Sequence, residues 1–169
     1  MAASHNAQGG GFTRMYTSTP TVSDTPDYTS GDLMGGKITI TQAGTANDGR
    51  PHRLTDFSGI IQSVIIMDLD ARNLDIDVVF FDTDPTNTTF TDNATFDIND
   101  TDLLTVIGVV NVTTWAAFND NGVGKSVNEG LAFHTGLNGS AIYAALVARG
   151  AHNLSTTNAL TLRVGILED

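Results

Sequence analysis

Cysteine is absent from this chain of 169 residues. Its absence excludes disulfide bonds, thiol catalysis and cysteine-based metal sites together. Glutamate and lysine are scarce as well, with only Glu129 and Glu168 and only Lys37 and Lys125. Both residue types are good helix formers, whereas the abundant aspartate, asparagine, threonine and glycine favour caps, turns and strands. The composition therefore argues against a helical protein.

Positive charge is also scarce, because eight lysines and arginines stand against 19 aspartates and glutamates and leave a net charge of −11. A surface of this sign repels phosphate backbones and anionic lipids. We therefore expect no nucleic-acid partner and no membrane partner. The acidity fits either a partner with basic patches or solubility at high copy number, and we favour solubility.

No apolar run approaches the roughly 20 residues that a membrane-spanning helix needs. The first residues, MAASHNAQGGGF, lack the charged and apolar regions of a secretory signal. Without an export signal, the six Asn-x-Ser/Thr triplets are better interpreted as loop sequence than as glycosylation sites.

Catalytic motifs are missing or incomplete. Asn119–Ser126 resembles the phosphate-binding loop G-x-x-x-x-G-K-[ST], but Asn119 replaces its first glycine and no helical sequence follows. We interpret the run as a glycine-rich β-turn. The four histidines have no paired metal-ligand spacing, and no G-x-S-x-G elbow is present, although a triad assembled from distant residues stays open. We predict no enzyme activity and no cofactor.

The most polar block of the chain is 82–102. Two sets of oxygen-bearing side chains in it are candidate calcium ligands: Asp82, Asp84 and Asn87, or Asp97, Asn99 and Asp102. Neither set has EF-hand spacing, and such side chains more often hydrogen-bond their own backbone. No metal site is predicted, although a structural cation stays open. Phe90, Phe96 and Ile98 indicate an ordered loop.

Period-two alternation and β-branched runs predict several short strands: 37–41, 60–67, 74–81, 106–112, 130–135, 141–148 and 160–166. The short linker between 60–67 and 74–81 predicts a hairpin. Asn99 or Asp100 is expected to cap a short helix through Leu104. We predict a mainly all-β fold: an antiparallel β-sandwich, jelly-roll-like, with an extended N-terminal arm and at most one or two short helices.

Residues 1–36 are rich in glycine, serine, threonine and proline and contain few aliphatic side chains. They predict an extended arm before a single sandwich domain at 37–169, with a frayed terminus as the alternative. Within the arm, the candidate partner contacts are Phe12, Arg14, Met15 and Tyr16. Trp115 is interpreted as a buried sandwich tryptophan rather than an interface anchor.

The run VVFFDTDPTNTTFTDNATFDINDTDLLTVIGVV, from Val78 to Val110, resembles a motif recurrent in structural proteins of tailed bacteriophages, often encoded beside the major capsid protein. Flanking segments fit the same pattern: SGDLMGGKITI (Ser30–Ile40), SGIIQSVIIMDLD (Ser58–Asp70), GLAFHTG (Gly130–Gly136), AIYAALVARGA (Ala141–Ala151) and the terminal LTLRVGILED. The likeness covers nearly all of the chain after its first residues.

Resemblance to head decoration (cement) proteins of such phages implies a β-sandwich or jelly roll, often a homotrimer, without catalytic residues. It implies a virion protein on the capsid surface, assembled in the host cytoplasm. Its partners would be the major capsid protein and further copies of itself, and it would stabilise the head by clamping adjacent capsid subunits. No motif residue carries this role over position by position.

Two other functions stay open. One is a different virion component, such as a tail, baseplate or head–tail connector protein. The other is a carbohydrate-binding or hydrolytic sandwich module, which would display exposed aromatic side chains on a sheet face. Aromatic residues make up only 7% of this chain, which disfavours the carbohydrate module.

Overall fold

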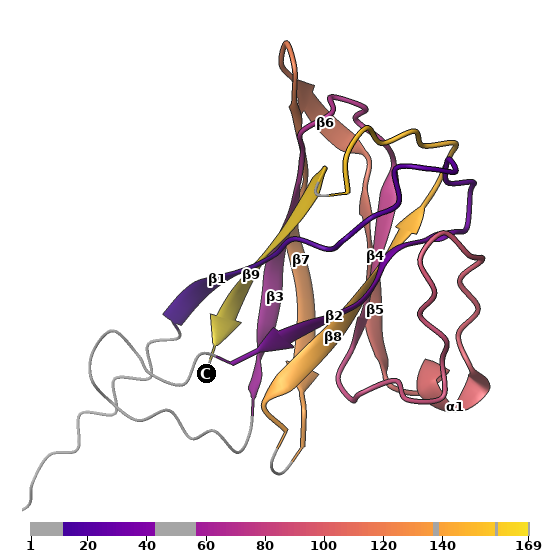
Figure 1. The fold of residues 1–169 in the computed structure, drawn as a ribbon. Coiled ribbons are helices and arrows are strands. Elements are labelled where there is room, and N and C mark those ends of the chain that lie inside the picture. Colours follow the sequence, from indigo (N-terminus) through magenta and orange to yellow (C-terminus); the bar gives the residue numbers. More distant parts are fainter. Residues whose placement is uncertain (1–11, 43–56, 137–138, 158, 169) are drawn as a thin grey trace, which may run out of the picture.

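A computed structural model describes residues 12–42, 57–136, 139–157 and 159–168, which form two antiparallel sheets packed face to face (Figure 1). The five-stranded sheet has the order β1(Phe12–Ser18), β9(Leu160–Glu168), β3(Ser58–Asp68), β7(Gly122–His134), β6(Thr114–Ala117). The four-stranded sheet has the order β2(Leu33–Thr41), β8(Ala141–Ala148), β4(Ile76–Phe81), β5(Val106–Val112). The helix of the described chain is α1(Asp100–Leu103).

The strand order is jelly-roll-like. The chain crosses repeatedly from one sheet to the other, so that the first and last strands pair and β8 lies between β2 and β4. This arrangement confirms the predicted mainly all-β sandwich with at most one or two short helices. The predicted hairpin between 60–67 and 74–81 is wrong, because β3 and β4 lie in different sheets.

The core between the sheets comes from strand alternation. On β9, Leu162, Val164 and Ile166 point inward and are at most 1% exposed. On the facing sheet, Ile142 and Leu146 of β8 are fully buried. Burying a side chain of this size contributes roughly 1.5–3 kcal/mol, so these alternating positions fix which face of each strand is internal.

The structure differs from the predicted arm at 1–36. Its residues 1–11 lie outside the described residues, but all seven residues of β1 pair with β9. After β1, Val22 and Tyr28 are buried in the main core, and β2 begins at Leu33, so the predicted boundary at 36/37 falls inside a strand. Everything described from residue 12 onward belongs to the sandwich.

The loop 82–102 covers the outer face of the four-stranded sheet and builds a second, smaller core there (Figure 1). Val79 and Phe81 of β4 are buried on this side, which explains why every residue of β4 is buried. Phe90, Phe96 and Ile98 of the loop pack against them. The prediction that these three side chains pin an ordered loop is confirmed.

Candidate interaction face

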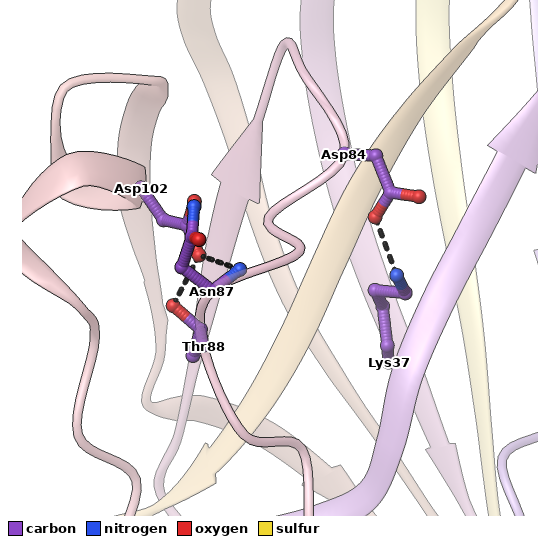
Figure 2. Close-up of polar contacts among 5 residues, drawn as sticks. All are labelled: Lys37, Asp84, Asn87, Thr88 and Asp102. Carbon is purple, nitrogen blue, oxygen red and sulfur yellow. Dashed lines mark hydrogen bonds and ion pairs between the residues drawn. The ribbon is translucent and has the colours of Figure 1, made fainter.

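Asp102 anchors the loop 82–102 through hydrogen bonds that Figure 2 draws in part. Its carboxylate accepts from the Asn87 backbone N–H at 2.9 Å, from Asn87 Nδ2 at 3.0 Å and from Thr88 Oγ1 at 2.7 Å. Burial alone raises the pKa of the Asp102 carboxyl, but the hydrogen bonds from Asn87 and Thr88 outweigh burial and lower that pKa. The carboxylate therefore serves the loop's own structure.

Lys37 fixes the same loop from β2. Its ammonium forms an ion pair with Asp84 (Figure 2) and lies 5.8 Å from the ring centroid of Phe90 and 5.5 Å from that of Tyr143. Burial and the Asp84 carboxylate raise the pKa of Tyr143, and Lys37 partly offsets this. Lys37 is thus engaged with the loop.

Asp92 ties the loop to Tyr28, which precedes β2, and to Gly35 within β2. Its carboxylate accepts from the Tyr28 hydroxyl at 2.7 Å and from the Gly35 backbone N–H at 2.6 Å, while the Tyr28 hydroxyl accepts from Ser23 N at 2.5 Å. Burial and the bond to Asp92 raise the pKa of Tyr28. Among the described residues, no three histidine or acidic side chains gather as a metal-binding group.

The glycine-rich run 119–126 is part of a β-hairpin. Phe118 N donates to Asn121 O at 2.8 Å at the tip, and the run from Gly122 continues into β7. A Cβ on Gly124 would lie 2.7 Å from Cε2 of Trp115, which packs against the main core. The turn interpretation is confirmed for the tip. Gly124, just after the tip, has no side chain and therefore leaves room for the indole of Trp115 on β6.

The two histidines among the described residues, His134 and His152, lie in different environments. His134 is exposed at the end of β7, where its Nδ1 accepts from Gly136 N at 3.0 Å. His152 is 3% exposed, with Nε2 3.3 Å from the Asp75 carbonyl oxygen. Burial is the largest influence on the pKa of His152 and lowers it. His5 and His52 lie outside the described residues.

The four predicted contact residues on β1 do not share one face. Arg14 Nε lies 3.3 Å from Glu168 Oε2, and the Tyr16 hydroxyl donates to Glu168 Oε1. Glu168 is 1% exposed, so Arg14 and Tyr16 point toward the sandwich interior. Met15 points the other way and is 42% exposed. Phe12 pairs with Glu168 in the backbone register, and its side chain lies outside the described residues.

Met15 belongs to the outer face of the five-stranded sheet. Because Val64, Ile66, Leu162 and Val164 point into the core, the residues between them point out. The strand registers place these outward side chains in three central rows: Met15, Gly165, Ser63 and Val127; Thr17, Arg163, Ile65 and Lys125; and Thr161, Met67 and Val123. We call these three rows the outer face.

The outer face combines apolar and hydroxyl side chains with two positive charges. Ile65 lies between Arg163 and Lys125 in register, and Val127 is 52% exposed. A Cβ on Gly165 would lie 2.4 Å from Ser63 Oγ and 3.1 Å from Met15 Sδ, so glycine lets these neighbours approach closely across β9. Within the described part of the chain, no carboxylate occupies the three rows.

The acidic residues of the five strands point elsewhere. Asp68 and Glu168 are each 1% exposed. Glu129 lies in the β7 bulge opposite Ile61 and Ser63, and it accepts a hydrogen bond from the hydroxyl of Ser126, whose register partner is the core residue Val64. The chain has a net charge of −11, yet the three described rows of the outer face contain two cationic side chains and no carboxylate.

The sequence did not predict that Ile65, Lys125 and Arg163 lie side by side on one face. Their proximity arises from strand pairing between residues that are nearly 100 positions apart in the chain. The local signal for Arg163 was available, since it alternates with Leu162 and Val164 and must leave the core side. Nothing local indicated that Lys125 would join it.

In the described residues, no helix has the length and apolar character required to cross a membrane. No protein-family model matches the sequence, and no curated protein matches it.

Proposed function

We propose that this protein is a non-enzymatic structural component of a tailed-phage particle, and that it decorates the outer surface of the capsid and stabilises the head. The observation that carries the proposal is the position of the carboxylates in the fold. Asp92 and Asp102 hold loops, while the three rows of the outer face, as far as the structure describes them, contain no carboxylate. The resemblance of Val78–Val110 to phage structural proteins supports the same function.

A rigid sandwich with an open sheet face suits binding to a repeating lattice. Each subunit needs only a modest interface, since symmetric attachment of an oligomer to neighbouring capsid subunits multiplies affinity through avidity. The major capsid protein is the proposed partner, and a homotrimer is the proposed assembly. The virion surface is then its location, reached after assembly in the host cytoplasm.

The function is tested by adding purified protein to phage heads that lack it and measuring co-sedimentation and bound copy number. We expect saturation at hundreds of copies per head and a raised temperature of genome release. A reconstruction of heads with and without the protein should show added density on the outer lattice. Absence of binding, or density confined to other positions, contradicts the proposal.

Copy number also tests the alternative of a tail, baseplate or connector component, because a connector ring holds about a dozen subunits rather than hundreds. A carbohydrate-binding module is disfavoured by the outer face, since none of its three described rows contains an aromatic side chain. A glycan array without hits would dispose of that alternative.

A further inference from the structure

We infer that the outer face of the five-stranded sheet is the surface that docks onto the particle, and that it receives a protein surface carrying carboxylates around an apolar centre. This inference rests on the proposed function and adds to it the orientation of the bound protein and the chemistry of its partner. The side covered by loop 82–102 then faces away from the partner.

The chemistry of the outer face indicates the kind of partner that it fits. Its central side chain, Ile65, is flanked in register by Arg163 on β9 and Lys125 on β7. Met15 and Val127 are 42% and 52% exposed in the neighbouring row. An apolar centre bordered by separated cations matches a partner that offers apolar contacts and carboxylates, because opposite charges steer and orient association.

The outer face also has a suitable size. Its three rows cross four strands about 4.8 Å apart, and outward side chains recur about every 6.8 Å along a strand, so the rows cover roughly 19 by 20 Å. That area, about 400 Å², is about half of the roughly 800 Å² that each partner contributes to a stable protein interface. The loops at the ends of the strands supply the remaining contact area.

The opposite side of the sandwich is less suited to an acidic partner. The outer face of the four-stranded sheet is already occupied, since Phe90, Phe96 and Ile98 cover Val79 and Phe81. Asp97 and Asp100 of the covering loop are exposed and present negative charge to solvent. Like charges therefore repel an acidic partner from that side and favour docking through the outer face.

The experiment uses the full-length protein and phage heads that lack it. Lys125→Glu and Arg163→Glu reverse the two charges of the outer face. Arg72→Glu is the matched control, because Arg72 is an exposed arginine in the β3–β4 connection and its substitution changes the net charge equally. Affinity for heads is measured by co-sedimentation at low and physiological salt, and the oligomeric state of each variant by sedimentation velocity.

We expect Lys125→Glu and Arg163→Glu each to weaken binding to heads at least about tenfold, with Arg72→Glu close to wild type and wild-type affinity falling as salt rises. If wild type binds and the face variants bind as well as the control, the inference is overturned and the proposed function stands. If the face variants instead dissociate an oligomer, the outer face contacts a second copy and the inference is overturned. If wild type does not bind heads at all, the proposed function fails and the inference fails with it.

Discussion

The hydroxyl of Thr88 donates a hydrogen bond of 2.7 Å to Oδ2 of Asp102, and both side chains are buried. The same threonine accepts from the Asn99 backbone N–H at 3.1 Å. Thr88 therefore connects the first half of loop 82–102 to the start of α1, where Asn99 is the N-cap. The loop is held as a covering layer by a few specific polar contacts in addition to its apolar side chains.

Substitution of Asp102 should loosen this layer. We expect Asp102→Ala to lower the free energy of unfolding more than Asp102→Asn, because alanine leaves all three donors from Asn87 and Thr88 without an acceptor. Urea unfolding and hydrogen exchange in 82–102 measure the effect. Asp97→Asn, at an exposed position of the same loop, is the control and should change little.

The stabilisation by Asp102 should depend on pH in a defined direction. Its pKa is lower in the folded state, so the contribution is complete above the ordinary carboxyl pKa of about 3.9 and is lost as the pH falls through the folded-state value. The stability difference between wild type and Asp102→Asn should therefore shrink in acid. A difference that stays constant from neutral pH down to pH 2 would contradict this account.

Gly124 should tolerate no larger residue. In Gly124→Ala, the new Cβ would lie 2.7 Å from the Trp115 ring and 2.8 Å from Val112 Cγ1. We expect a loss of about 1–3 kcal/mol in the free energy of unfolding. Trp115→Leu should cost less in the Gly124→Ala background than in wild type, and simple additivity of the two substitutions would argue against the contact.

His152 should make the protein less stable in mild acid. Burial lowers its pKa in the folded state, so the unfolded chain binds more protons once the pH falls below about 6.5. The free energy of unfolding of wild type should therefore decrease from pH 7.5 to pH 5.5. His152→Gln should flatten this decrease, whereas His134→Gln, at an exposed position, should retain it.

Tyr16 should contribute to stability through its hydroxyl. Tyr16→Phe preserves the ring contact with Phe57, whose centroid is 5.9 Å away, and removes the hydrogen bond to the buried Glu168. We expect a loss of about 1–3 kcal/mol. Met15→Thr, one residue away but outward-facing, should stay within about 0.5 kcal/mol of wild type. Equal effects of the two substitutions would contradict the alternation along β1.

The sequence predicted strands where alternation is apolar on the inner side. In β9, Leu162, Val164 and Ile166 form such a pattern, and in β3 the β-branched run predicted a strand, although only alternate residues of that strand are buried. The loop 82–102 was predictable because its three apolar side chains interrupt a polar block. These patterns involve only residues that are close in the sequence, so they can be recognised without knowledge of the tertiary structure.

β1 was missed because its inward side chains are polar. Arg14 and Tyr16 face the interior to meet Glu168, which lies more than 150 residues away in the sequence. Long-range partners also hold Asp77 on β4. It is 7% exposed, accepts from Asn111 Nδ2 at 2.5 Å and pairs with Arg149 at 2.5 Å.

The position of the last two strands has a consequence for synthesis on the ribosome. β9 separates β1 from β3, and β8 separates β2 from β4, so neither sheet can be completed until residues 141–168 have left the exit tunnel. Nascent chains that lack them expose the unpaired backbone edges of four strands, which invites aggregation. Premature stop codons late in the reading frame should thus yield insoluble polypeptide rather than a shortened working protein.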